Sequence, residues 1–316
     1  MHQQRGVALI TILIMVALAT LLAASIAQHQ AFTRESTAYL MRQNQSLLYA
    51  KSAETFFIEL LQDDAQSAGN VDHRQENWAQ PMPAFPVEDG YVTGYIEDNS
   101  GKFNLNSLVD EEGKVNETAK LFFEQLLVRL DLSPQLSQAV IDWQDADDEP
   151  IGPMGAESSY YYSLPRAIFP ANAAFYLPEE LRMVRGFEGE NYQKILPYVS
   201  ALPHSKTTIN INTAPAMILA NLHERLDVNT VQQALDQQQA ELKHFQNIED
   251  LWVIAPFDQL TPDERQKFTQ LLGVQSQYFV ARTETMLSER KRQFSSHLVR
   301  DSKRVYVSSR SMLPFK

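Results

Sequence analysis

The longest apolar stretch of the chain lies near its N-terminus, where Val7 to Ala27 carries no charged side chain. As an α-helix, these 21 residues would be about 30 Å long, which matches the hydrocarbon thickness of a bilayer. An ordinary secretory signal has a shorter apolar core, of about 7 to 15 residues. The pattern therefore predicts a helix that spans a membrane.

The helical pattern does not stop where the apolar stretch ends. From Gln28 onward the sequence contains no glycine or proline until Gly69. Within this part, apolar side chains recur with helical spacing at Ala50, Ala53 and Phe57. We expect one continuous helix over residues 7–62, roughly 80 Å long, whose second half lies on a globular domain.

The remaining sequence changes character twice. Residues 63–90 are polar and then rich in proline, which indicates a linker or an irregular loop. Residues 91–97 alternate as a strand does, and a turn signature follows at 98–101. Helical periodicity then recurs in seven segments: 117–130, 134–144, 178–184, 191–200, 215–224, 229–245 and 262–272. Strand-forming residues dominate three final segments: 277–286, 293–299 and 304–312.

These elements predict an α+β fold, in which a long N-terminal helix packs on a small antiparallel sheet. The sheet would be divided in the sequence, with its first part in residues 63–103 and its last strands in 276–316. Residues 104–275 would form a large all-helical domain inserted between the two parts. Two similar motifs, Phe103–Leu108 and Ile209–Pro215, alternate apolar residues with asparagine, and in each an Asn or Thr could cap a following helix.

The formal net charge of −12 disfavours a general nucleic-acid binder, because such proteins neutralise phosphates with basic residues. The charge is unevenly distributed. Residues 277–316 contain nine Lys or Arg against three acidic residues, whereas the window between Arg129 and Arg166 contains seven acidic residues and no Lys, Arg or His. The absence of cysteine rules out disulfides and thiolate metal sites.

The acidic window is the strongest candidate for a chemical site. Five carboxylates fall within eight residues, and Glu157 follows in a segment rich in proline and glycine. Carboxylate oxygens in such a loop are the ligands that Ca²⁺ prefers, so we expect a calcium site. The spacing is not that of an EF-hand, and a solvated acidic loop is the simpler alternative. The candidate ligands are Asp142, Asp145, Asp147, Asp148, Glu149 and Glu157.

The N-terminus resembles that of a type IV prepilin or a type II secretion pseudopilin. It has a short leader, residues 1–6, with Arg5 and then Gly6 directly before the apolar stretch. The resemblance implies that a prepilin peptidase cuts between Gly6 and Val7 and that the new N-terminus, Val7, is methylated. The fifth residue after this cut is Glu in most of these proteins, but here it is Thr11. That Glu is thought to neutralise a neighbouring subunit's N-terminal amine, so its loss suits a subunit at the filament tip.

Three further segments sharpen the resemblance. The sequences DWQDADDEP, NSGKFNLNSL and ININTAPAMIL, with the Thr11 start, resemble the K-type minor pseudopilins of type II secretion systems. Such a protein is a non-enzymatic pilin-fold subunit with a calcium-binding helical insert. The resemblance implies a tip complex with the I and J minor pseudopilins, on top of the major pseudopilin filament. It also implies a single-pass inner-membrane protein with its body in the periplasm, an orientation that the basic leader favours as well.

Three alternatives remain open at this point. An enzyme is disfavoured, because the sequence contains no nucleophile elbow, P-loop, dinucleotide fingerprint or zinc-protease motif. A membrane-anchored helix-hairpin-helix nucleic-acid binder is suggested by residues 211–222, but the hairpin that follows lacks the glycines that would bring backbone amides to phosphate. A minor subunit of another type IV pilus-like system is the third alternative.

Overall fold

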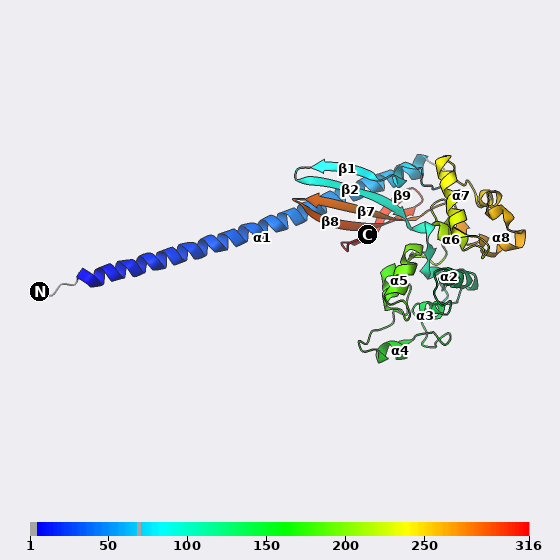
Figure 1. Cartoon of the computed structure of the whole chain (residues 1–316), viewed down its shortest axis with the longest axis horizontal. Coiled ribbons are helices and arrows are strands. Elements are labelled where there is room, and N and C mark those ends of the chain that lie inside the picture. Colours follow the sequence, from blue (N-terminus) through cyan, green and yellow to red (C-terminus); the bar gives the residue numbers. More distant parts are fainter. Residues whose placement is uncertain (1–4, 68–70, 316) are drawn as a thin grey trace.

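The computed structural model describes residues 5–67 and 71–315. Helix α1, Arg5–Ser67, is a single helix of 63 residues whose N-terminal half projects from the body (Figure 1). Residues 1–4 of the expected leader lie outside the described residues, and the helix already includes Arg5 and Gly6. The helix also continues beyond its expected end at residue 62. The polar residues 63–67 remain helical, and the Ser67 hydroxyl donates a hydrogen bond to the Asp63 carbonyl at 2.6 Å.

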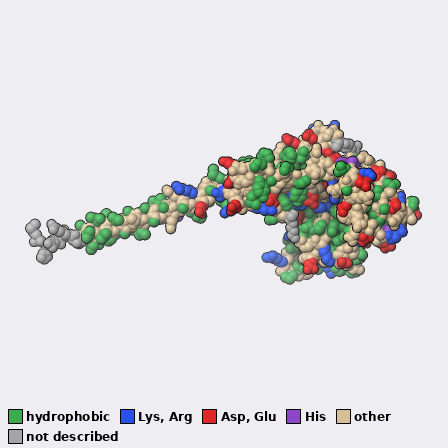
Figure 2. Space-filling view, turned by 45° about the horizontal axis from the view of Figure 1, so that its top comes forward, with side chains coloured by type: hydrophobic (Ala, Val, Ile, Leu, Met, Phe, Trp, Pro, Cys, Tyr) green, Lys and Arg blue, Asp and Glu red, His purple; other side chains and the backbone are tan. Residues whose placement is uncertain are grey.

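The projecting part of α1 is long and apolar enough to cross a membrane. Its most apolar 18-residue window has a mean hydropathy of 2.7, and none of that window is buried against the rest of the chain. Apolar side chains line this thin part of the molecule (Figure 2). Side chains such as Leu13 and Leu21 are more than half exposed there, which is costly in water and favourable in lipid.

The second half of α1 packs on an antiparallel sheet with strand order β1-β2-β7-β8-β9. The strands are β1 (Met82–Val87), β2 (Gly90–Asp98), β7 (Tyr278–Leu287), β8 (Arg290–Asp301) and β9 (Arg304–Ser311). Phe57 and Leu61 of α1 are fully buried in a core with Trp78, Ile96 and Phe279. The amphipathic pattern of the helix thus predicted its packing face correctly.

Strand β1 corrects one expectation. Its sequence, MPAFPV, lies in the segment that we expected to be an irregular loop because of its prolines. Proline has no N–H to donate. In a central strand the N–H groups on both sides form hydrogen bonds to neighbouring strands, whereas in an edge strand only those that face its one neighbour do. Strand β1 lies at the edge of the sheet, pairs only with β2 and has an irregular register between Met82 and Phe85.

The insert interrupts the sheet between two strands that pair along their whole lengths. Strand β2 runs antiparallel to β7, from Gly90 opposite Leu287 to Asp98 opposite Phe279. The chain therefore leaves the sheet and re-enters it at the same end, remote from the N-terminus. The insert gathers at that end, and one part of it extends to the side (Figure 1).

The prediction that the insert is all-helical was wrong in part, because short helices alternate with irregular segments and two short strand pairs. Its helices are α2 (Glu117–Arg129), α3 (Leu136–Asp142), α4 (Ser158–Ser163), α5 (Glu190–Ile195), α6 (Ala216–Ala220), α7 (Val228–Ala240) and α8 (Pro262–Thr269). Its 3₁₀ segments are η3 (Leu105–Ser107), η4 (Pro178–Met183), η5 (Leu196–Tyr198), η6 (Ile248–Val253) and η7 (Phe257–Gln259). Two short parallel pairs complete it: β3 (Phe103–Asn104) with β4 (Val199–Ser200), and β5 (Ile209–Asn210) with β6 (Leu272–Gly273).

The two asparagine motifs open two similarly built halves of the insert. The Asn106 side chain donates to the Phe175 carbonyl and accepts from the Phe175 amide, both at 2.8 Å. Asn212 makes the same pair of bonds with Phe245, at 3.0 and 2.8 Å. Each motif thus fastens the start of its half to a distant loop, because these side chains satisfy buried backbone groups. The expected capping role is confirmed for Asn104, which accepts from the Asn106 amide at the start of η3, but it was wrong for α6, whose N-cap is Pro215 and has no side-chain hydrogen bond.

Candidate metal centre

Three of the expected ligands come together in the first half of the insert. Asp142 ends α3, Asp145 follows in the next turn, and Glu157 is the residue before α4. A carboxylate oxygen from each lies within 4.8 Å of one from each of the other two. We refer to Asp142, Asp145 and Glu157 as the loop carboxylates. Their spacing could bring oxygen ligands around one cation, because Ca²⁺ binds oxygens at 2.3–2.6 Å.

The aromatic core beneath the loop holds the loop carboxylates in place. Trp143 is buried, and its ring meets Tyr161 edge to face at 5.3 Å between centroids. Asp142 is also fully buried, and its carboxylate accepts hydrogen bonds from the backbone amides of Ala156, at 2.7 Å, and Ile151, at 3.2 Å. These bonds fold the segment 151–156 back onto the end of α3, which brings Glu157 beside Asp142.

Gly155 makes this close approach possible. A Cβ atom at position 155 would lie 2.4 Å from the nearer Asp142 carboxylate oxygen, which is well inside van der Waals contact. Glycine therefore allows the backbone to pass directly against Asp142. The Arg185 guanidinium also holds this segment, since it donates a hydrogen bond to the Gly155 carbonyl at 2.8 Å.

Among the described residues, Glu157 is the loop carboxylate with the most buried oxygens that lack a hydrogen bond. Its side chain is 1% exposed, and neither carboxylate oxygen has a hydrogen-bond partner among the described residues. One carboxylate oxygen of Asp145 is also buried and has no hydrogen-bond partner among the described residues. A buried carboxylate without a partner is costly to ionise, so such a site favours either a proton or a metal ion.

The pKa values of the loop carboxylates are raised, because burial disfavours their charged forms. Burial, together with the neighbouring Asp142 and Asp145 charges, raises the pKa of Glu157 to about 8. Burial and the Asp147 charge raise the pKa of Asp145 to about 6. Burial also raises the pKa of Asp142, against the two backbone hydrogen bonds that favour its charged form. Without a cation, Glu157 therefore retains its proton near neutral pH.

The other three expected ligands lie outside this close group. Asp147, Asp148 and Glu149 are exposed. The Asp148 carboxylate accepts from the Ser158 amide at 3.0 Å, and the Asp147 carboxylate accepts from the Glu149 amide at 2.8 Å. These bonds shape the loop, and both aspartates are near enough to raise the Glu157 pKa. The structure thus separates the loop carboxylates, of which Asp142 and Glu157 are buried and Asp145 is half-buried, from an exposed acidic rim.

Asn172 is a residue beside the acidic loop that the sequence pattern did not single out. Its side-chain amide lies 3.4 Å from the Asp147 carbonyl, and its side-chain oxygen is buried with no partner among the residues described. It belongs to a loop far along the chain, in the left-handed region at φ 42°, which Asn tolerates better than most residues. A local search for acidic residues could not find it, because neither its type nor its neighbours stand out.

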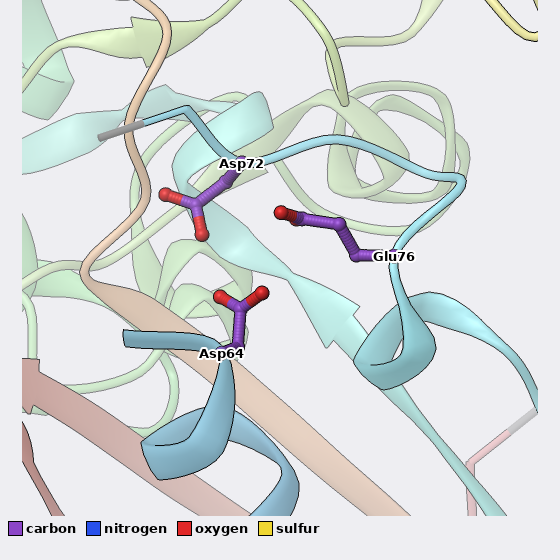
Figure 3. Close-up of side chains that lie close together, drawn as sticks. All are labelled: Asp64, Asp72 and Glu76. Carbon is purple, nitrogen blue, oxygen red and sulfur yellow. The ribbon is translucent and has the colours of Figure 1, made fainter. Parts of the chain in front are cut away.

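A second acidic group lies where α1, the sheet and the insert meet. Asp64, Asp72 and Glu76 each bring a carboxylate oxygen within 4.8 Å of the others (Figure 3). No sequence pattern singled out these residues. Unlike the loop carboxylates, this group includes a basic residue, because Arg300 pairs with Asp64 and Asp72.

The hairpin between α6 and α7 is the part that would contact phosphate if the chain were a helix-hairpin-helix nucleic-acid binder. The Arg225 guanidinium donates to both carboxylate oxygens of Glu264, at 2.6 Å each, and His223 lies 3.2 Å from the same carboxylate. Both bonds come from one guanidinium nitrogen, so the carboxylate occupies a donor that could otherwise bind a phosphate. The basic groups of this hairpin are thus already engaged within the chain.

Comparison with known proteins identifies the family. Models of type II secretion system protein K match residues 101–204 and 209–275, which correspond to the two halves of the insert. The type II secretion system protein K of Pectobacterium carotovorum is 33% identical over 303 residues, which cover 91% of this chain and 90% of that protein. The protein of the same name from Pseudomonas aeruginosa is 37% identical over 70% of this chain and 68% of its own length.

A solved structure supports the fold. A chain in the crystal structure of the GspK-GspI-GspJ complex from enterotoxigenic Escherichia coli superimposes with a TM-score of 0.78. The match covers 88% of this chain and 99% of that one, at 23% sequence identity. The two chains therefore share a fold over the matched part. With the relatives' identity and coverage, these findings show that the chain belongs to the type II secretion system protein K family.

Proposed function

We propose that this protein is a non-enzymatic minor pseudopilin at the tip of the type II secretion pseudopilus. The position of the insert is the observation that carries the proposal. It gathers at the end of the body farthest from the N-terminus and extends to the side (Figure 1). At this end the insert would block a further pilin subunit from adding to the filament above it. The exposed half of α1 could still pack with the helices of subunits below.

Thr11 supports the same position. In the family that the N-terminus resembles, a Glu at this place is thought to neutralise the N-terminal amine of a neighbouring subunit. A threonine hydroxyl carries no charge, so it cannot replace a carboxylate beside an ammonium group. A subunit with nothing ahead of it has no such amine to neutralise.

The N-terminal half of α1 would anchor the subunit in the inner membrane before assembly, with the body in the periplasm. Its apolar surface is exposed along a length that can span the bilayer. We infer from the short leader that prepilin peptidase removes residues 1–6 between Gly6 and Val7, after which Val7 is methylated. N-terminal mass spectrometry of the protein from membranes tests this step, and an unprocessed Met1 terminus would contradict it.

The partners proposed for this chain are the I and J minor pseudopilins and, below them, the major pseudopilin filament. The support is the fold shared with a chain of the GspK-GspI-GspJ complex, together with family membership. The test is co-expression of tagged full-length protein with the I and J pseudopilins of the same system, followed by purification in detergent. A stoichiometric ternary complex is expected, and a chain that elutes alone while I and J pair with each other would contradict the proposal.

We also propose that the loop carboxylates bind Ca²⁺. The donors are hard oxygens, and Glu157 offers two buried carboxylate oxygens without protein partners among the described residues. A divalent ion would replace the protons that burial otherwise retains on Glu157 and Asp145. The ion's role would be structural, since it would join the end of α3 to the start of α4 in a chain without disulfides.

A further inference from the structure

The second acidic group lies at a junction of three parts of the molecule. Asp64 is on the last turns of α1, Asp72 and Glu76 are in the segment that leads to β1, and Arg300 is on β8. We call these four residues the junction cluster. Figure 3 shows the three carboxylates pointing toward one another. Their side chains are 12%, 4% and 8% exposed, so water screens their repulsion poorly.

Arg300 neutralises two of the carboxylates. Its guanidinium donates to Asp64 at 2.9 Å and also to Asp72, and it contacts the Ser276 carbonyl at 2.6 Å. Asp72 receives a further hydrogen bond from the Ser276 amide at 2.7 Å. The charges of Asp64 and Asp72 are therefore already balanced in part by Arg300. The single positive charge of Arg300 cannot also neutralise a third carboxylate.

Glu76 has no comparable cation among the described residues. One of its oxygens accepts from the His73 amide at 2.9 Å and from the Trp78 indole at 2.7 Å. Its ion-pair contact is the His73 ring, at 3.8 Å. That ring stacks on His244 at 3.7 Å between centroids, and burial together with the His244 charge lowers the His73 pKa. The imidazole is therefore neutral near pH 7 and cannot balance Glu76.

We propose that the junction cluster holds a proton between Glu76 and Asp64 and acts as a pH-sensitive clasp between α1, the sheet and the insert. With the proton present, Glu76 donates to Asp64, and the two carboxyl groups attract each other. When the proton leaves, three carboxylates face Arg300 and repel one another, so the segment that carries Asp72 and Glu76 is pushed from the end of α1.

The clasp reaches the insert through Asp72. The Asp72 amide donates to the Val274 carbonyl at 2.8 Å, and the Asp72 carbonyl accepts from the Asn210 side chain at 3.0 Å. Asn210 in turn donates to the Ser276 hydroxyl at 2.7 Å, and that hydroxyl donates to Asp98 at 2.5 Å. Asp98 therefore adds another buried acidic group beside Asp72. A shift of the Asp72 segment would loosen contacts that position the second half of the insert.

The direction of the pH effect follows from the pKa values. Burial, with the neighbouring Asp64 and Asp72 charges, raises the pKa of Glu76 to about 7, and burial and Asp72 raise the pKa of Asp64. A carboxyl with a raised folded-state pKa contributes stability that is complete below its unfolded value. That contribution is lost as pH rises through the folded value. The clasp is therefore closed at pH 5.5 and open by about pH 8.5.

The Trp78 indole provides a local probe, because it donates directly to the Glu76 carboxyl. In full-length protein in detergent, labelled with ¹⁵N-tryptophan, the Trp78 indole signal should titrate with a midpoint near pH 7. It can be assigned by Trp78→Phe. In Glu76→Gln the titration should disappear, since the Gln oxygen can accept the same two bonds while its amide donates to Asp64. In Asp64→Asn the midpoint should fall, because a repelling charge is gone.

Thermal unfolding provides the second readout. The melting temperature of the wild type should fall between pH 5.5 and 8.5 by about 2 to 5 °C more than that of Glu76→Gln. Asp63→Asn, an exposed neighbour on α1, is the matched control and should behave as the wild type does. A Trp78 signal that stays constant over this range, or that titrates equally in Glu76→Gln, would overturn the proposal.

Discussion

Glu157 and Asp142 bring carboxylate oxygens within 4.8 Å of each other although both side chains are buried. They are adjacent because backbone amides at Ile151 and Ala156 bind Asp142 and turn the chain back onto α3. Asp142 has these donors, whereas neither oxygen of Glu157 has one among the described residues. This difference in hydrogen bonding between two neighbouring carboxylates is the basis for the proposed calcium site.

Calcium should stabilise the full-length protein against heat. Because Ca²⁺ would bind the folded loop and not the unfolded chain, millimolar Ca²⁺ should raise the melting temperature over a chelated control. Glu157→Gln and Asp145→Asn should each weaken Ca²⁺ binding by at least about tenfold, as they remove ionised ligands from the buried group.

The exposed rim provides the control for this measurement. Glu149→Gln removes a nearby charge outside the close trio and should reduce the calcium shift only slightly. If chelated and calcium-loaded wild type melt at the same temperature, the loop carboxylates are a protonated acidic cluster and not a metal centre.

The metal-free protein should lose stability as pH rises. The folded-state pKa of Glu157 is raised to about 8 and that of Asp145 to about 6. Their contribution is present below their unfolded pKa values and is lost as pH rises through 6 to 8. The chelated protein should therefore melt lower at pH 8.5 than at pH 5.5, and Ca²⁺ should reduce this difference.

The same linkage predicts proton release on calcium binding. Near pH 7, Ca²⁺ should displace about one proton from the loop carboxylates. Calorimetric titrations in buffers with different ionisation enthalpies measure this number. In Glu157→Gln the released proton should be absent, and an unchanged release in that variant would assign the proton to another group.

The packing of α1 on the sheet can be tested with two neighbouring phenylalanines. Phe57 is fully buried against Gly94 of β2, whereas Phe56 is 43% exposed. Phe57→Ala should reduce the free energy of unfolding by about 3 to 5 kcal/mol, because it removes buried area and leaves a cavity. Phe56→Ala should cost about 1 kcal/mol or less. Denaturant unfolding measures both, and equal losses would contradict the observed orientation of the helix.

The asparagine motifs predict an effect on the insert. Asn106→Ala leaves the buried amide and carbonyl of Phe175 without their side-chain partner, so unfolding should become easier by about 1 to 3 kcal/mol. Asn229→Ala, at an exposed position on α7, should change the unfolding free energy by less than about 0.5 kcal/mol. The comparison is made by denaturant titration, and similar values for both would show that the bonds to Phe175 contribute little.

Long regular elements were predictable from local pattern, whereas elements completed by distant partners were not. The uninterrupted run in α1, the alternation in β2 and the strand-forming residues of β7, β8 and β9 led to the correct pilin-like fold. Strand β1 was missed because its prolines are tolerated only through its edge position. The two-residue strands β3 and β5 depend on Val199 and Leu272, which are tens of residues away in the sequence.

The candidate sites, like the secondary-structure elements, were predictable where they depend on local sequence and not where they depend on distant residues. The local density of acidic residues located the loop carboxylates, but only the packing around Trp143 separates them from the exposed rim. The junction cluster escaped notice because Arg300 lies 228 residues from Asp72. Asn172 was missed for a related reason, since a neutral side chain in a loop has no distinctive pattern.

The location of this subunit in the pseudopilus tests the central claim most directly. Pseudopili from cells that express the tagged full-length protein can be labelled with gold at the insert and examined by electron microscopy. The account predicts label at one end of each filament, because the insert would block further subunits above it. Label distributed along the filament length would contradict a tip position and would make the protein an ordinary filament subunit.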